Sequence, residues 1–371
     1  MTSPNGPRTG RPTTRAANGM VATSHVLASG AGLAALRRGG SAVDAAIAAN
    51  AVLCVAYPHM AGLGGDAFFL LKARGEPVQA LNASGPAASA ADRAFYEGHD
   101  EIPSRGGAAA LTVPGAVDGW RQAHERHGRL PWSELFDDAV RYAREGLPVA
   151  RSLAQWAEQD VPVLSQQDQA ASLFLRDGRG LTEGQRLVNA GLAESFETIA
   201  RDGARAFYEG PLATRFCDAL RPLGSPLAAD DLAAFSAEWV EPISTTYRDL
   251  QVFEFPPNTQ GFAALQILNA LEGWDVKGFG DLTADYLHHV AEAVKLSFAD
   301  RDAWLTDPKS LDIPVERLIS KQYADERRAL VDPDTSLPMG DLTSGVPGAP
   351  GTPLVRSPIG SEVSGSTSAR R

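Results

Sequence analysis

Met60-Ala-Gly-Leu-Gly-Gly-Asp-Ala-Phe68 is the most informative segment of the chain, because an Ala-rich block precedes it and an apolar run follows it. Upstream, residues 28–46 are mostly small and helix-forming, with a break at Gly39-Gly40. Downstream, Phe68-Phe-Leu-Leu71 begins a segment typical of a strand. Glycines between a helix and a strand usually serve a tight turn or close backbone packing. The stretch therefore predicts a helix–loop–strand unit.

Local patterns extend this unit in both directions. Residues 21–56 predict a strand followed by two helices, and Ser41 is placed to cap the second, with Asp44 at its third position. The segments 68–72 and 78–82 predict paired strands around a turn. This layering of helices and strands favours an α/β (layered α+β) sandwich over a helical bundle.

Further along the chain the patterns are mainly helical. Ser133 is placed to cap a helix over residues 134–143. Residues 239–255 alternate as a strand, whereas 261–271 and 286–304 have helical spacing.

Composition restricts the class of protein. The 371 residues are 44% hydrophobic and 21% charged, which is typical of a soluble globular enzyme. The formal net charge of −11 argues against nucleic acid as a partner, because phosphate binding needs clustered Lys and Arg. No apolar run approaches the roughly 18 residues that a membrane span needs, so no membrane association is expected.

The cysteines and the first residues indicate a compartment. Cys54 lies in an apolar run and is expected to be a buried, inert thiol. Cys54 and Cys217 are the two cysteines, which suits a reducing compartment. Residues 1–8 lack the apolar core of a secretory signal. We therefore expect a cytoplasmic protein.

Composition also divides the chain into parts. Residues 1–17 are polar and predict a loose N-terminal arm. Residues 18–332 form the expected body. From residue 333 to 371, Pro, Gly, Ser and Thr dominate, and such a segment cannot bury enough apolar surface to offset its ordering entropy. We expect a flexible tail there.

Motif searches find no complete catalytic centre. In His124-Glu-Arg-His127 the histidines are three apart, whereas a zinc-binding helix motif has them four apart, so a solvated helix end is favoured. His288 and His289 are adjacent and point to different helix faces. No nucleophile elbow or phosphate-binding loop is present. The sequence predicts no metal site and no cofactor.

Several blocks together resemble one family. The glycine stretch is joined, in order, by residues 19–25, Thr112-Val-Pro-Gly-Ala-Val-Asp-Gly-Trp120, Pro256-Pro-Asn-Thr-Gln-Gly261 and Glu292-Ala-Val-Lys-Leu-Ser-Phe-Ala-Asp-Arg301. This arrangement is similar to the large subunit of the γ-glutamyltranspeptidase family, whose members are N-terminal nucleophile hydrolases. The resemblance implies half of an αββα sandwich, opened by a strand at 19–25 and completed by a small subunit.

The resemblance also implies where the chemistry lies. The nucleophile would be the N-terminal Thr of the small subunit, with its own α-amine as general base, so no catalytic residue is expected in this chain. Both subunits would come from one precursor that cuts itself, with Arg371 near the processing point. The expected partners are that small subunit and a small-molecule substrate, with heterodimers able to assemble further.

The chain departs from the γ-glutamyltranspeptidases at Asp66, where they usually have Gly, and resembles the acylase-type branch there; it also departs from them at an Arg position. In γ-glutamyltranspeptidases, an Arg after the glycine cluster binds the α-carboxylate of the glutamyl donor. Here Leu81-Asn-Ala-Ser-Gly-Pro-Ala-Ala88 holds no Arg or Lys: Ser84 takes the place of the Arg on one register and Pro86 on another. Arg93 and Arg105 are expected to be surface charges rather than substitutes.

Neutral residues are the remaining candidates for the pocket. Asn82 and Ser84, with Gly85 and Pro86, are expected to line the pocket. An equally good interpretation is that Asn82 and Ser84 only provide hydrogen bonds to the backbone at the strand end and the turn. Gly64, Gly65 and Asp66 are expected to support the loop, Asp66 by capping or orienting it rather than by touching substrate.

The resemblance, together with the missing Arg, implies a threonine hydrolase with a non-glutamyl substrate. The expected reaction is cleavage of an amide or a carbon–carbon acyl bond, in the manner of relatives in alkylproline antibiotic pathways. Cephalosporin acylase and oxamate-type amidohydrolase activities are alternatives. True γ-glutamyl transfer or glutathione hydrolysis, and a non-catalytic binding subunit, are further alternatives.

Overall fold

The computed structural model describes residues 13–109, 111–338 and 342–347, so Arg371 and parts of the expected arm and tail lie outside the described residues. The chain forms two compact units. Unit 1 comprises Met1–Ala67 and Ala83–Ala237, and unit 2 comprises Phe68–Asn82 and Glu238–Arg371.

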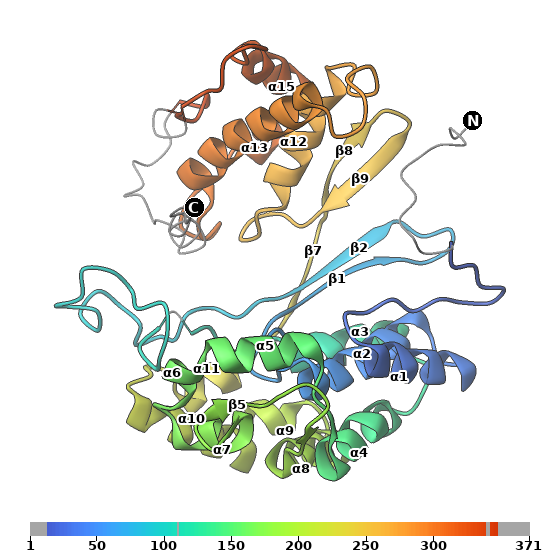
Figure 1. Cartoon of the computed structure of the whole chain (residues 1–371), viewed down its shortest axis with the longest axis vertical. Helices are drawn as coiled ribbons and strands as arrows, with labels where there is room; N and C mark the ends of the chain where they lie inside the picture. The colour runs from blue at the N-terminus through green and yellow to red at the C-terminus, as the bar shows by residue number, and fades with distance from the viewer. Residues whose placement is uncertain (1–12, 110, 339–341, 348–371) are drawn as a thin grey trace, which may run out of the picture. The chain divides into compact units, whose positions relative to one another are not determined.

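Unit 1 is built mainly from helices, which Figure 1 colours from blue to yellow-green. Its helices are α1 Val26–Arg37, α2 Ala42–Ala56, α3 Ala116–His127, η1 Trp132–Phe136, α4 Asp137–Glu145, α5 Arg151–Gln159, α6 Val161–Leu164, α7 Asp168–Phe174, α8 Ala190–Asp202, α9 Arg205–Tyr208, α10 Pro211–Leu220, η2 Arg221–Leu223 and α11 Ala229–Ala234. Its short strands pair as β3 Leu147–Pro148 with β6 Arg186–Leu187, and β4 Leu175–Arg176 with β5 Arg179–Gly180.

The Ala-rich helices of unit 1 are confirmed. α1 and α2 pack side by side (Figure 1), and a Cβ placed on Gly32 would lie 2.9 Å from the carbonyl oxygen of Ala45, so the close approach requires a small residue. The expected cap is also present: the Ser41 hydroxyl accepts from the Asp44 N–H, and the Asp44 carboxylate accepts from the Ser41 N–H at 2.7 Å.

Unit 2 combines a small sheet, a hairpin and helices. β1 Ala67–Lys72, β2 Val78–Ala83 and β7 Glu238–Val240 form a sheet in the order β1-β2-β7, and β8 Ile243–Tyr247 pairs antiparallel with β9 Leu250–Glu254. Its helices are α12 Gly261–Glu272, α13 Ala284–Trp304, α14 Val315–Leu318 and α15 Lys321–Arg328. α12 packs against α13, the β8–β9 hairpin and α15 (Figure 1). A cluster including Phe262, Trp304, Leu318 and Tyr323 forms its core.

The paired strands at 68–72 and 78–82 and the helices at 261–271 and 286–304 are confirmed by β1, β2, α12 and α13. The strand expected at residues 19–25 is wrong, because these residues form no ladder. Extended backbone becomes a strand only beside a hydrogen-bonded neighbour, and Thr23 instead bonds locally to His25 and Ser29.

Two further expectations are wrong. Ser133 caps no helix: residues 132–136 form the 3₁₀ turn η1, and α4 begins only at Asp137. The strand expected over 239–255 is divided into β7, β8 and β9. Between β8 and β9, Arg248 adopts a φ of 55° and the chain reverses.

Candidate functional site

The glycine stretch folds back on the end of α2. The N–H groups of Met60 and Ala61 both donate to the carbonyl of Tyr57, and the Gly65 N–H donates to the Gly62 carbonyl at 3.1 Å. These bonds form a compact loop between α2 and β1.

The same loop is fixed to the start of α3. The carbonyl of Gly65 accepts from the N–H groups of Gly115 at 3.0 Å and Ala116 at 2.9 Å. Two otherwise unpaired donors of the helix terminus are thereby satisfied. Gly65 thus contacts the block Thr112–Trp120, which the sequence analysis singled out separately.

Asp66 orients the segment that follows β2. Its carboxylate accepts a hydrogen bond from the backbone of Gly85. Burial raises the pKa of the half-buried Asp66 carboxyl, and the Gly85 bond only partly opposes that shift. This contact fits the expected orienting role, and whether Asp66 also touches substrate stays a prediction.

Gly85 lies where no other residue fits. A Cβ on Gly85 would lie 1.7 Å from the carbonyl oxygen of Val113, and the Val113 N–H donates to the Pro86 carbonyl at 2.9 Å. Ala87 and Thr112 complete the contact as an antiparallel bridge. The segment that carries Ser84, half-buried, and Pro86, exposed, is therefore held against residues 112–113.

An open hollow of about 560 Å³ lies beside the glycine loop within unit 1. It is lined by Asn50, Pro58, His59, Met60, Ala61, Gly62, Gly64, Gly65 and Asp66. Both ring nitrogens of His59 are shielded from solvent and have no hydrogen-bond partner. Burial lowers the pKa of His59, so its imidazole is neutral at pH 7. The lining offers no hydroxyl or thiol nucleophile, and it supplies hydrogen-bonding groups only.

Asn82 belongs to unit 2, whereas Ser84, Gly85 and Pro86 belong to unit 1. It pairs with Glu238 in the β2–β7 ladder, and its side-chain N–H donates to the side-chain oxygen of Asn258 at 2.9 Å. Asn258 comes from the block Pro256–Gly261. The structure thus brings together two blocks that are 176 residues apart in the sequence.

The rest of that block forms the entry to α12. The Thr259 hydroxyl donates to the carbonyls of Phe255 and Pro256, and it accepts from the Gly261 N–H at 3.2 Å. The side-chain oxygen of Gln260 accepts from Arg301 at 3.1 Å. This turn places Asn258 beside the end of β2.

The two arginines considered as substitutes lie on the surface, as expected. Arg93 is exposed. The Arg105 side chain is 60% exposed and faces Asp160 at 3.8 Å. Neither provides a buried guanidinium.

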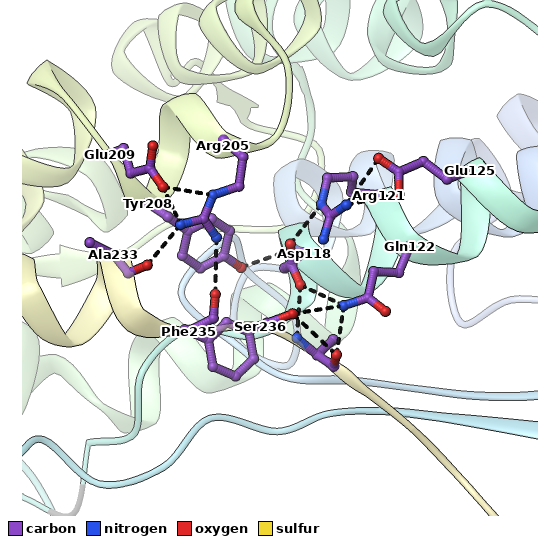
Figure 2. Close-up of polar contacts among 11 residues, drawn as sticks. Asp118, Arg121, Gln122, Glu125, Arg205, Tyr208, Glu209, Ala233, Phe235 and Ser236 are labelled. Atoms are coloured by element: carbon purple, nitrogen blue, oxygen red, sulfur yellow. Dashed lines mark hydrogen bonds and ion pairs between the residues drawn. The ribbon is translucent and has the colours of Figure 1, made fainter.

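A buried carboxylate holds the segment that leads into β7. Asp118 is fully buried and accepts from Arg121 at 2.8 Å, from Gln122 at 3.0 Å and from the N–H of Ala237 at 2.8 Å (Figure 2). The Asp118 N–H donates to the Tyr208 hydroxyl at 2.9 Å. The residue before β7 is therefore tied to the first turn of α3.

Arg205 holds the same segment from the other side. Its guanidinium donates to the carbonyls of Ala233 and Phe235, at 2.9 Å each, and bonds to Glu209 (Figure 2). The chain between α11 and β7 is thus fixed by backbone contacts to two charged side chains.

Some of these residues were not predicted. His59 was one of seven histidines without an assigned role, and its position directly before the glycine stretch was the available signal. The bond between Asp118 and Ala237 could not be predicted from the sequence, because the two residues are 119 positions apart. In the described ranges, no group of three or more His, Cys, Asp or Glu side chains could hold a metal ion. No helix there is long and apolar enough to cross a membrane.

Comparison with known proteins identifies the family. The sequence profile of the family described as gamma-glutamyltranspeptidase matches residues 28–352. The chain belongs to this family. Among curated relatives, the glutathione hydrolase-like YwrD proenzyme of Bacillus subtilis (strain 168) is 42% identical over 330 residues, covering 88% of this chain and 63% of the relative.

Solved structures of the family share the fold. The γ-glutamyltranspeptidase of Helicobacter pylori matches with a TM-score of 0.86 and 26% identity, covering 92% of this chain and 100% of that one. The cephalosporin acylase of Bacillus halodurans matches with a TM-score of 0.80 and 35% identity, covering 89% and 63%. The expected N-terminal nucleophile hydrolase fold is thereby confirmed. The chain spans about 60% of the length of the curated relatives it matches.

Proposed function

We propose that this chain is the large-subunit part of a γ-glutamyltranspeptidase homologue that matures by self-cleavage into a threonine hydrolase. Family membership supports the proposal, and so does the extent of the match: the chain covers all of the H. pylori chain but only 63% of the YwrD proenzyme. The nucleophile would then be the first Thr of a small subunit. That subunit would bind to this chain and complete the sandwich.

We further propose that the substrate is an acyl compound without a glutamyl α-carboxylate. The observation that carries this proposal is the segment after β2, where Ser84, Gly85 and Pro86 occupy the region in which the family resemblance calls for an Arg. Gly85 is fixed against Val113 and Asp66, so the segment is a rigid, uncharged support. A buried carboxylate without its guanidinium would lose several kcal/mol of binding.

The chemistry follows from the proposed nucleophile. The Thr hydroxyl would attack the substrate carbonyl while the α-amine takes its proton, and the leaving group would be an amine or a stabilised carbanion. A neutral pocket suits both outcomes. We propose the carbon–carbon acyl cleavage of alkylproline-type antibiotic biosynthesis as the specific role, with amide hydrolysis of the cephalosporin acylase or oxamate type as the alternative.

A true γ-glutamyl hydrolase is the second candidate. The similarity to a protein named glutathione hydrolase-like favours it. It requires that a carboxylate-binding Arg come from a part of the protein outside the segment 82–88.

The two candidates differ in their response to paired substrates. The full precursor would be purified, its self-cleavage followed on denaturing gels, and the new N-terminus sequenced. The matured protein would then be assayed with a γ-glutamyl anilide and with a pentanoyl anilide, which lacks the α-carboxylate and α-amine. The proposal expects kcat/KM for pentanoyl anilide to equal or exceed that for γ-glutamyl anilide.

The other outcomes are equally clear. A preference of a hundredfold or more for the γ-glutamyl anilide would establish the second candidate. A precursor that neither cleaves itself nor turns over either anilide would indicate a binding subunit and overturn the enzyme assignment.

A further inference from the structure

The block Glu292–Arg301 takes no part in the candidate site, although the sequence analysis singled it out. It lies on α13, and three of its charged residues, Glu292, Lys295 and Asp300, fall on one side of that helix at three- to five-residue spacing. Glu292 and Asp300 are each only 1% exposed. Buried carboxylates need hydrogen-bonding or charged partners, so each of these two residues must contact such a group.

Asp300 accepts from Gln266 on α12 at 3.0 Å and lies 3.7 Å from Arg327 on α15. Further partners of both carboxylates come from a short segment downstream of α15. We define the strap as residues 336–337 and 344–346, all within unit 2. Its first part binds Glu292: the Ser336 hydroxyl donates to that carboxylate at 3.0 Å and the Leu337 N–H at 3.3 Å. Lys295 lies 2.6 Å from Glu292 and donates to Ser336 and to the Leu337 carbonyl at 2.7 Å.

In this first anchor, the positive charge of Lys295 compensates the negative charge of Glu292. Burial by itself would raise the pKa of the Glu292 carboxyl, but the bonds from Lys295 and from the strap outweigh it and lower that pKa. Charge-assisted hydrogen bonds of this kind are about twice as strong as neutral ones. The strap therefore contributes to keeping Glu292 ionised.

The second part of the strap binds around Asp300. The Gly345 N–H donates to the Tyr323 hydroxyl at 2.9 Å and to Asp300 at 3.3 Å, while that hydroxyl donates to Asp300 at 2.6 Å. The Trp304 indole N–H donates to the Ser344 hydroxyl at 3.1 Å, and Val346 packs on the core of unit 2.

Gly345 fits this anchor tightly. A Cβ there would lie 2.8 Å from the Tyr323 hydroxyl and 3.0 Å from the edge of its ring. A side chain at residue 345 would push the strap away from α13 and α15. Two separate anchors on one helix thus hold a segment whose composition alone predicts no structure.

We propose that Glu292, Lys295 and Asp300 are positioning residues for self-cleavage, which hold the strap so that the chain downstream of it is presented in a defined direction. The proposal rests on the proposed function. In that reaction the Thr hydroxyl oxygen attacks the preceding carbonyl carbon, the C–N bond breaks as the C–O ester bond forms, and the nitrogen takes the hydroxyl proton. Water then hydrolyses the ester to a carboxylate and restores the hydroxyl.

The size of the change in self-cleavage rate distinguishes a strap that aligns the cleavage point from one that only shortens the connection to it. Releasing the strap would lengthen the connection between α15 and the cleavage point by about a dozen residues, which changes loop-closure free energy by only a few tenths of a kcal/mol, or about twofold in rate. Loss of alignment has a larger effect, since a displacement of about 1 Å can lower a rate a hundredfold. A decrease of roughly tenfold or more in the self-cleavage rate is therefore expected.

The test uses the full precursor with the double substitution Ser336→Ala/Gly345→Ala. It removes the Ser336 hydroxyl bonds of the first anchor, pushes residue 345 away from Tyr323 at the second, and leaves the sequences of α13 and α15 unchanged. Thr343→Ala is the matched control, because Thr343 is exposed and close to the strap. Self-cleavage is timed on denaturing gels, and each protein is then incubated to completion and assayed for turnover per small-chain N-terminus.

The double variant is expected to cleave at least about tenfold more slowly than wild type and Thr343→Ala, yet to reach wild-type turnover once cleaved. Cleavage within twofold of wild type would overturn the proposal. Slower cleavage with an equally reduced final turnover would show a merely structural role and also overturn it. A wild-type precursor that never cleaves would overturn the proposed function itself, which is a different result from the other two.

Discussion

The carboxylate of Asp118 accepts the backbone N–H of Ala237 at 2.8 Å, and Ala237 directly precedes β7. Within unit 2, β7 pairs with β2 at Asn82. α3, the helix that carries Asp118, receives the glycine loop through the Gly65 carbonyl. The first turn of α3 is thus where the glycine stretch and the approach to β7 are both held.

Asp118→Ala is expected to destabilise the protein by about 3–5 kcal/mol, because it leaves the Arg121 charge and the Ala237 N–H without their buried partner. The decrease in the unfolding midpoint of the full protein measures this. Asp202→Ala is the control, since Asp202 pairs with Arg201 on the surface, where solvent screens the pair, so its effect should be far smaller than that of Asp118→Ala. Equal effects of the two substitutions would contradict the buried network.

Gly85→Ala is expected to cost about 2–3 kcal/mol and to reduce turnover, because the new Cβ would lie 1.7 Å from the Val113 carbonyl oxygen and displace Ser84 and Pro86. Gly30→Ala is the matched control: Gly30 is an exposed position in α1 with nothing within 4 Å of its Cβ. That change should stabilise the protein by up to about 1 kcal/mol. Thermal unfolding and anilide turnover of both variants decide the matter.

The pH dependence of stability should reveal the raised pKa of the Asp66 carboxyl. Its pKa is raised by burial above the usual 3.8, so the folded state is disfavoured once pH rises through the raised value and the carboxyl ionises. Asp66→Asn keeps an acceptor for the Gly85 N–H and removes the charge. Its unfolding midpoint should therefore exceed that of wild type at pH 7, and the difference should shrink as pH falls toward 3.8.

A control with the opposite sign is available. The pKa of Asp202 is lowered by its hydrogen bond with Arg201, so its contribution is present above the unfolded pKa and is lost as pH falls. Asp202→Asn should thus lower the midpoint slightly at pH 7 and not at low pH. A pH-independent difference for Asp66→Asn would contradict the assigned cause.

Both cysteines should be unreactive in the folded protein. Burial raises the pKa of Cys54 to about 12 and also raises that of Cys217, so neither forms the reactive thiolate at pH 8. A thiol reagent is expected to label neither until denaturant is added, and both afterwards. Ser133→Cys introduces an exposed thiol as a positive control. Labelling of the native wild-type protein would contradict this and show that the environment of Cys54 or Cys217 opens.

Local signals predicted the elements that local interactions determine. Ser41 and Asp44 form a reciprocal cap within one turn, and the Thr283 hydroxyl accepts from the Tyr286 N–H at the start of α13, so both helix starts are held by neighbouring residues. Ser133 fails for a tertiary reason: the Trp132 indole donates to the Ile199 carbonyl, and burial of residues 135–136 favours a 3₁₀ turn over a capped helix.

Long-range contacts determine what the sequence could not predict. The reversal at Arg248 lacks Gly, Pro and Asn, and it is held by the bond of its N–H to Glu272 on α12. The position of the strap could not be predicted either, because its partners on α13 are more than 40 residues away in the sequence. At the candidate site, residue types identified Asn82 and Gly85, but only the fold shows Asn258 and Val113 as their partners.

Ser84→Arg tests whether the uncharged segment sets the substrate class. A guanidinium at the family position could bind the α-carboxylate of a γ-glutamyl donor with two parallel hydrogen bonds, so kcat/KM for the γ-glutamyl anilide should rise at least about tenfold. Pro86→Arg tests the other register, and one of the two variants should show the gain. Ser84→Lys should gain less, because an ammonium cannot form the paired bonds. Ser133→Arg adds the same charge at an exposed position and should leave both anilide activities unchanged. If neither Arg variant gains γ-glutamyl activity, the carboxylate site of the family does not lie at this segment.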